Sequence, residues 1–69
     1  MKRSELERKI RRAARVAGIE TRVRSGGRHD LWVCGSVRVT IARHREINEF
    51  TAEGIQKDLE DEFGKGWWR

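Results

Sequence analysis

The sequence predicts an α+β domain with two layers, in which two helices cover one face of a three-stranded antiparallel sheet. Two observations predict this fold class. Apolar residues recur at helical spacing near both ends of the chain, and three short runs in the middle alternate between apolar and polar residues. The 69 residues leave room for one domain. We place this domain at residues 1–64 and expect residues 65–69 to form a short tryptophan-rich tail.

The first helix is expected over residues 5–17. Ser4 and Glu7 have the spacing of a capping box, which is typical of a helix start, and Gly18 is expected to end the helix. The apolar stripe comprises Leu6, Ile10, Ala13, Ala14 and Ala17.

The second helix is expected to begin with Thr51 as its N-cap and to end at Gly64. Its first turn contains Glu53, which suits the helix dipole there. Its buried stripe comprises Ala52, Ile55, Leu59 and Phe63.

Three runs with a period of two residues predict the strands, at residues 19–24, 29–34 and 37–41. A turn at residues 25–27 and a two-residue turn at Gly35-Ser36 would join them into a meander. In the middle run, His29, Leu31 and Val33 alternate with Asp30, Trp32 and Cys34. The sheet face turned away from the helices is expected to carry Glu20, Arg22, Arg24, Trp32, Arg38 and Thr40.

Basic residues are concentrated in the front part of the chain. Residues 1–45 hold 13 Lys or Arg against 4 Asp or Glu, whereas residues 46–69 hold 3 against 7. This balance favours a polyanionic partner for one face, although an ordinary solvated surface would carry the same charge. Arginine greatly outnumbers lysine in the front part, and arginine binds phosphate bidentately and stacks on bases. The bias therefore favours nucleic acid.

Composition also argues against several classes of protein. No apolar run approaches the length of a transmembrane helix, and no apolar signal-peptide core follows the opening Met-Lys-Arg. We therefore expect a cytoplasmic protein without a membrane partner. Cys34 is the single cysteine, so no internal disulfide can form, and a zinc site would need more cysteines or clustered histidines. We expect Cys34 to be a small buried side chain, and no cofactor or metal.

His29 stands at the start of the second strand, behind Gly26 and Gly27. An imidazole can act as a general acid or base near neutral pH. In RNA, a base removes the 2′-hydroxyl proton, that oxygen attacks the adjacent phosphorus, and an acid protonates the leaving 5′-oxygen. Arginines would stabilise the charge on the phosphate, and the glycines would let the backbone approach it. Spacing alone leaves a structural or merely exposed histidine as the alternative.

A second basic group, Arg43, His44 and Arg45, lies in the loop expected at residues 42–50. These side chains could hold a phosphate, or Arg43 and His44 could fix the loop through hydrogen bonds. We favour a structural or binding role for His44 over a catalytic one. Trp32 also has open alternatives, because an aromatic ring on a polar sheet face could stack on a base, cover a partner or pack on neighbouring arginine stems.

Two short motifs in this order resemble those of the HicA toxins, small ribosome-independent mRNA interferases of bacterial toxin–antitoxin pairs. The Gly27-Arg28-His29-Asp30 segment is similar to a Gly-Ser-His-His-like segment, and Ile41-Ala42-Arg43-His44 is similar to a Val/Ile-Pro-Arg-His segment. A Ser-x-x-Leu/Ile helix that ends in glycine, a later Glu-Ile pair and a threonine before Lys57-Asp58-Leu59 extend the resemblance over residues 4–62.

The resemblance implies an αβββα fold like that of double-stranded-RNA-binding domains, and metal-independent endonucleolytic cleavage of mRNA. It implies that His29 is catalytic and that a HicB-like antitoxin covers this residue. The candidate RNA-binding residues are Gly27, Arg28, Arg22, Arg24, Trp32, Arg38, Arg43 and His44.

Three residues depart from the family pattern. Arg28 replaces the serine, Asp30 replaces the second histidine, and Ala42 replaces the proline, which makes that bend less rigid. Arg28 could add a phosphate contact. Asp30 could orient an imidazole, although strand alternation points it to the face opposite His29.

Two other functions remain open at this level. A non-catalytic module of the same fold would bind duplex RNA through phosphates and 2′-hydroxyls without needing a histidine. A small interaction protein would instead dock its basic first helix on an acidic partner.

Overall fold

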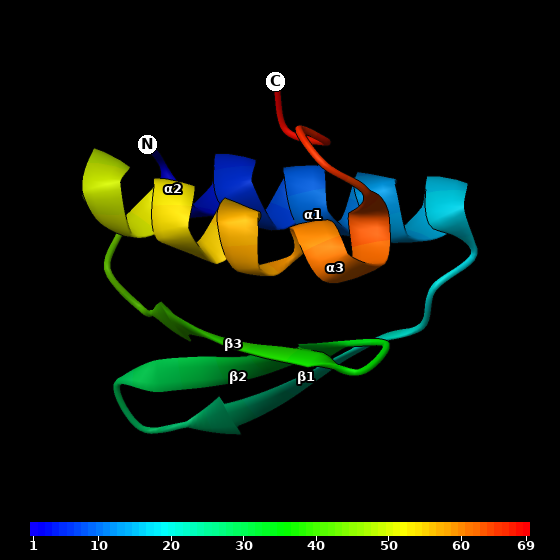
Figure 1. Cartoon of the computed structure of the whole chain (residues 1–69). Coiled ribbons are helices and arrows are strands. Elements are labelled where there is room, and N and C mark those ends of the chain that lie inside the picture. Colours follow the sequence, from blue (N-terminus) through cyan, green and yellow to red (C-terminus); the bar gives the residue numbers. More distant parts are fainter.

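The computed structural model describes residues 1–69 and confirms an α+β fold with two layers. Figure 1 shows all helices on one side of a three-stranded antiparallel sheet, whose strand order is β1-β2-β3. The elements, in chain order, are α1 (Arg3–Ala17), β1 (Thr21–Gly26), β2 (His29–Cys34), β3 (Val37–Ala42), α2 (Glu49–Asp58) and α3 (Glu60–Phe63). None of these helices is long and apolar enough to cross a membrane.

The register of the sheet decides which side chains share a face. Trp32 lies opposite Val23 on β1 and Val39 on β3, so these three side chains point to the same side of the sheet. That side faces the helices, because Trp32 and Val39 belong to one core cluster with Leu6 of α1. The opposite side, here called the outer face, carries Arg22, Arg24, His29, Leu31, Val33, Arg38 and Thr40.

The prediction that Trp32 lies on the outer face is therefore wrong. Its side chain is only 1% exposed and lies in the core beneath α1. Arg11 of α1 covers it, with the guanidinium carbon 4.8 Å from the ring centroid. Each face of β2 carries apolar side chains, Trp32 and Cys34 on one face and Leu31 and Val33 on the other. Burying Trp32 with Cys34 removes more apolar surface from water than burying Leu31 with Val33.

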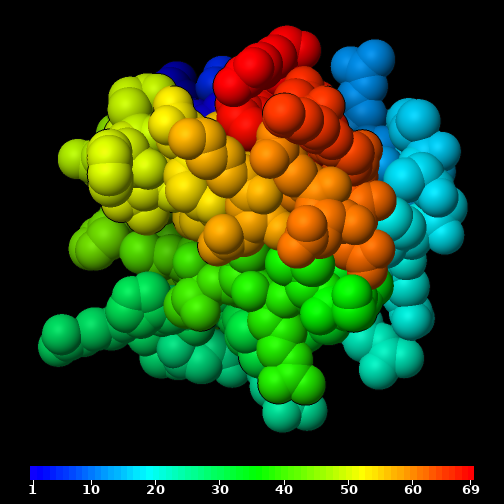
Figure 2. Space-filling view, in the orientation of Figure 1, coloured from blue at the N-terminus to red at the C-terminus, as the bar shows by residue number.

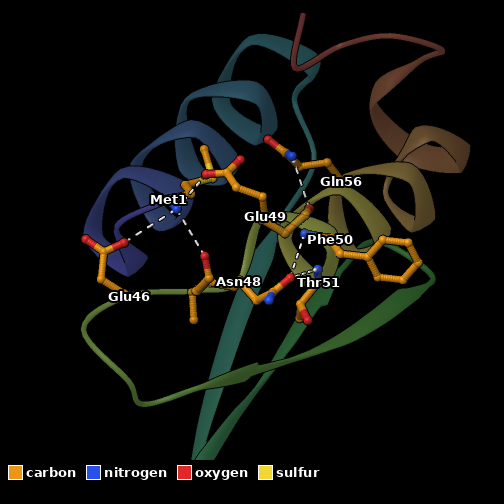
Figure 3. Close-up of polar contacts among 9 residues, drawn as sticks. Met1, Glu46, Asn48, Glu49, Phe50, Thr51 and Gln56 are labelled. Atoms are coloured by element: carbon orange, nitrogen blue, oxygen red, sulfur yellow. Dashed lines mark hydrogen bonds and ion pairs between the residues drawn. The ribbon is translucent and has the colours of Figure 1, made fainter.

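The helix starts also differ from the prediction. Ser4 lies inside α1, whose N-cap is Lys2 without a side-chain cap. The N-cap of α2 is Asn48 rather than Thr51, and its side chain accepts hydrogen bonds from the backbone N–H groups of Phe50, at 2.8 Å, and Thr51 (Figure 3). Asn is among the preferred N-cap residues because its short amide reaches these free N–H groups.

The chain start is attached to the same helix end. The Met1 ammonium donates to the carbonyl of Ile47 at 3.0 Å and to Oε1 of Glu49 at 2.7 Å (Figure 3). The hydrogen bond from the ammonium lowers the pKa of the Glu49 carboxyl. Glu49, rather than Glu53, is thus the acidic residue of the first turn of α2.

The second predicted helix is divided at Leu59 into α2 and α3, and it ends at Gly64 as expected. After Gly64 the tail turns back over the helix layer, on the side away from the sheet (Figures 1 and 2). Trp67 packs against the core cluster, and its indole N–H donates to the carbonyl of Gln56 at 2.8 Å. The tail is therefore held to the domain by both an apolar and a polar contact.

The β2–β3 turn is fixed to α3 by one carboxylate. Glu62 accepts hydrogen bonds from the backbone N–H of Ser36 and, at 3.1 Å, from its hydroxyl. Gly35 has a φ of 60° at the first central position of the turn, as the sequence predicts, and a Cβ there would overlap the Glu62 carboxylate. Glycine at position 35 therefore permits both the turn and this contact.

We expect Gly35→Ala to destabilise the protein by about 1–2 kcal/mol or more, because alanine is strained at this φ and Glu62 must also move. The control is Gly54→Ala on α2, where a Cβ meets nothing within 4 Å. That change should stabilise the helix by about 0.5–1 kcal/mol. Urea unfolding of both variants tests the prediction, and equal effects would contradict it.

Candidate nucleic-acid interface

The outer face of the sheet gathers exposed arginines from two strands. Arg22 and Arg38 lie on either side of Val33, and Arg24 lies opposite Leu31 in the next row. Arg24 and Arg38 form no ion pair, and Arg22 has one exposed contact, from Nη2 to Oε1 of Glu20 at 3.3 Å. These positions agree with the sequence prediction for all three arginines.

A shallow hollow of about 450 Å³ lies between these arginines. The half-buried side chains of Leu31 and Val33 line it, together with Arg22, Arg24 and Arg38. Guanidinium groups can bind phosphates, and the apolar side chains between them can contact sugar and base surfaces. The face therefore has the chemistry of a nucleic-acid surface.

His29 lies on the same outer face as these arginines. It is paired with Gly26 on β1 and Ala42 on β3, one row beyond Arg24 and Leu31. The side chain is exposed and forms no hydrogen bond within the protein. The burial of Trp32 and the outward position of His29 have one cause, because successive side chains of a strand point to opposite faces.

The turn beside His29 consists of Gly27 and Arg28. Gly27 has a φ of 56°, a conformation that glycine adopts easily, so the turn begins at Gly27 rather than at Ser25. Arg28 is exposed and forms no ion pair. The turn projects from the body of the molecule at the end where β3 leads into α2 (Figures 1 and 2). Both residues are thus accessible to a large ligand.

Asp30 and Arg43 join β2 to the loop after β3. Arg43 donates from Nε to Oδ1 of Asp30 at 2.8 Å, and its backbone N–H donates to the carbonyl of Arg28 at 3.0 Å. The Asp30 side chain is 16% exposed and that of Arg43 is 44% exposed. Arg43 thus fixes the loop, one of the two roles left open by the sequence, and Asp30 points away from His29, as alternation predicts.

We expect Asp30→Asn to lower the free energy of unfolding by about 1 kcal/mol, because the amide oxygen can still accept from Arg43 but the attraction between the two opposite charges is lost. The control is Glu53→Gln, which breaks an exposed pair with Lys57 at 3.4 Å and should cost about 0.5 kcal/mol or less. Chemical unfolding of Asp30→Asn, Arg43→Gln and the double variant measures the coupling. Additive effects of the two single changes would contradict the prediction.

His44 follows Arg43 in this loop and is exposed. It forms no hydrogen bond or ion pair within the protein, so it does not fix the loop. Because Ala42 pairs with His29, both histidines lie at the same end of the sheet. Trp32, in contrast, is removed from the candidate surface by its burial.

Cys34 is buried, as expected, and is not a candidate nucleophile. Burial raises the pKa of its thiol, which keeps the thiol protonated and unreactive. No group of three His, Cys, Asp or Glu side chains lies close enough together to hold a metal ion.

The candidate RNA-binding residues do not include a basic ridge on α1, although the sequence marks this helix as basic. Arg8, Arg11, Arg12 and Arg15 are exposed, form no ion pair, and line a hollow of about 740 Å³ without any hydrophobic residue. Like charges at spacings of three and four residues repel each other on a helix. That spacing was the available signal, because no acidic residue interrupts the ridge between Arg8 and Arg15.

In comparisons with known proteins, no family model, curated protein or solved structure matches this chain. The fold and the outer face define a small α+β domain with an arginine-rich sheet surface. The functional argument therefore rests on the residues themselves.

Proposed function

We propose that the protein is a HicA-like toxin, a cytoplasmic, metal-independent endoribonuclease that cleaves mRNA with His29 at the reacting phosphate. The proposed αβββα domain resembles double-stranded-RNA-binding domains in its order of elements, and we propose that its outer sheet face holds the RNA. The observation that carries the proposal is the shared face of His29, Arg22, Arg24 and Arg38. A general acid or base beside several phosphate-binding groups suits cleavage of a phosphodiester bond.

The proposed step uses the RNA's own 2′-hydroxyl as the nucleophile. His29 accepts the 2′-hydroxyl proton, the 2′-oxygen forms a bond to phosphorus, and the bond from phosphorus to the 5′-oxygen breaks. The leaving oxygen takes a proton from an acid, and the products carry a 2′,3′-cyclic phosphate and a 5′-hydroxyl. Arginine guanidinium groups stabilise the charge that builds up on the phosphate oxygens.

Incubation of the purified protein with a long messenger RNA in EDTA tests the proposal. We expect fragments with 2′,3′-cyclic phosphate and 5′-hydroxyl ends, and no cleavage of the equivalent DNA, which has no 2′-hydroxyl. Intact RNA after long incubation, or DNA cut equally well, would overturn the nuclease assignment. Fragments with 5′-phosphate ends would overturn the proposed step.

The proposed partner is an acidic or mixed antitoxin of the HicB type that covers His29. Such an inhibitor needs only to bury the histidine and place carboxylates against the basic surface. The exposure of His29 and of the Gly27-Arg28 turn makes both accessible to another protein.

Arginine substitutions on the outer face should weaken RNA binding and its salt dependence. For the triple change of Arg22, Arg24 and Arg38 to Gln, we expect a loss of about tenfold or more in affinity. The slope of log affinity against log salt should fall by about 2, because three phosphate contacts are lost. The charge-matched control changes the exposed Lys2, Lys57 and Lys65 to Gln. Titration of fluorescent RNA measures both, and equal losses would indicate a general charge effect.

A second candidate function is RNA binding without cleavage. The observation that favours it is that His29 has no hydrogen-bond partner to orient its imidazole, whereas catalytic histidines are usually oriented by a second group. This module would bind RNA with the same salt dependence and would leave it intact. The fragment analysis above distinguishes the two functions.

A further inference from the structure

A groove on the helix layer lies outside the candidate RNA surface. It has a volume of about 460 Å³ and runs between the second half of α1 and the tail. Val16, Ala13 and Trp68 supply apolar surface, and Lys9, Arg12 and Arg69 add three positive charges. No acidic side chain lines the groove. This part of the molecule faces away from the sheet, because the tail lies on the outer side of the helices (Figure 1).

The exposure of Val16 shows that no other part of the protein covers this end of the groove. Its side chain is 81% exposed, although the tail packs against α1 close by. Lys9 donates from Nζ to the carbonyl of Trp68 at 3.3 Å, which attaches the tail to α1 beside the groove. Exposed apolar surface rimmed by charge is typical of an interaction site.

We propose that this groove binds an acidic protein segment with an apolar anchor. The apolar anchor would cover Val16 and Ala13, and carboxylates on either side would pair with Lys9, Arg12 and Arg69. The charge complementarity favours an acidic partner, since three basic side chains and no acidic side chain line the groove. The inference is independent of RNA cleavage, because it uses none of the outer-face residues.

The aromatic surface favours a protein segment over a nucleobase. The Arg69 guanidinium lies over one face of the Trp68 ring, 5.2 Å from its centroid, and the Trp67 and Trp68 rings form a T-shaped pair with centroids 6.1 Å apart and planes inclined by 74°. Base stacking needs an open aromatic face, whereas an aliphatic anchor fits against Val16 and Ala13.

The probe is a synthetic peptide in which one leucine and one tryptophan are flanked by glutamates. Calorimetry should detect saturable binding that weakens as salt is raised. Amide NMR spectra should place the largest shifts at residues 12–17 and 67–69. Peptides with the glutamates changed to glutamine, or with the two apolar residues changed to serine, should each bind about tenfold more weakly.

Val16→Glu is the informative variant, because its exposed position lets the protein fold while a negative charge enters the groove. We expect a loss of about tenfold or more in peptide affinity. Thr40→Glu adds the same charge on the outer face of the sheet and should bind the peptide normally. Circular dichroism confirms that both variants are folded.

Three results would overturn the proposal: no saturable binding of the acidic peptide, NMR shifts centred on the outer face, or equal losses in the two variants. Displacement of the peptide by single-stranded RNA, with RNA shifts at residues 12–17, would assign the groove to nucleic acid. A concentration-dependent dimer that Val16→Glu abolishes would assign it to a second copy of the chain. Failure of RNA cleavage would leave the peptide result unchanged.

Discussion

His29→Ala is expected to reduce RNA cleavage by about 10²- to 10⁴-fold, the usual contribution of a general acid or base, while RNA binding changes little. The reason is the position of the side chain: it is exposed at the start of β2, on the sheet face opposite the core. Removing it therefore leaves no cavity and breaks no hydrogen bond. Rates of RNA cleavage by wild type and variant, measured on one substrate under saturating protein, report the effect on the chemical step.

His44→Ala is the matched control, since His44 is exposed and unbonded at the same end of the sheet. We expect His44→Ala to retain most of the cleavage rate. Equal losses in the two variants would show that both histidines take part, with one as the base and the other as the acid. Full activity of His29→Ala would contradict the assignment of His29 and transfer the chemistry to another residue.

The same pair can be tested in cells. Expression of the wild type from a tight promoter should arrest growth with loss of mRNA, and His29→Ala should not. Growth arrest by both proteins, with intact mRNA, would indicate that RNA binding rather than cleavage is toxic. Thermal unfolding of the purified variant is required as a control, since an unfolded protein would also be harmless.

Most of the fold could be predicted from local patterns. The positions of α1 and of the three strands follow from apolar periodicity, and Gly18, Gly35 and Gly64 stand where the chain must turn or end. The helix starts could not be predicted as well. Ser4 and Thr51 are both good capping residues, yet the N-caps are Lys2 and Asn48, because helix starts also depend on contacts with distant parts of the chain. The start of α1, for example, is joined to the loop before α2, where the backbone N–H of Arg3 donates to the carbonyl of Arg45.

The main difference from the prediction is which side chains of β2 face the helices. This choice decides whether Trp32 or His29 shares the outer face with the arginines. Periodicity could not decide it, because both faces of β2 carry apolar side chains. The turn could have decided it: a two-residue turn at Gly35-Ser36 pairs Cys34 with Val37, so both must share a face. Because Arg38 and Thr40 are expected on the face turned away from the helices, alternation places Val37 on the helix side, and Cys34 and Trp32 must lie on that side too. The arginines were correctly placed because β1 and β3 alternate clearly between apolar and charged residues.

Trp32→Ala is expected to destabilise the protein by about 3–5 kcal/mol, the usual cost of removing a buried aromatic ring. A domain of this size has a free energy of unfolding of about 3–10 kcal/mol, so the variant will be largely unfolded or close to it. The ring packs in the core cluster with Leu6, Ile10 and Val39, and Arg11 loses its aromatic contact as well. Circular dichroism with urea titration measures the loss.

Trp32→Phe separates the contribution of the ring from that of the indole N–H. The indole nitrogen is buried without a hydrogen-bond partner, and an unsatisfied buried donor costs about 1–3 kcal/mol. Phenylalanine removes this donor and keeps most of the apolar contact, so we expect a loss of about 1 kcal/mol or less. A stable, folded Trp32→Ala variant with weakened RNA binding would contradict the burial of Trp32. In that case Trp32 would lie on the outer face beside the arginines, and His29, one step out of phase with it, would point toward the helices.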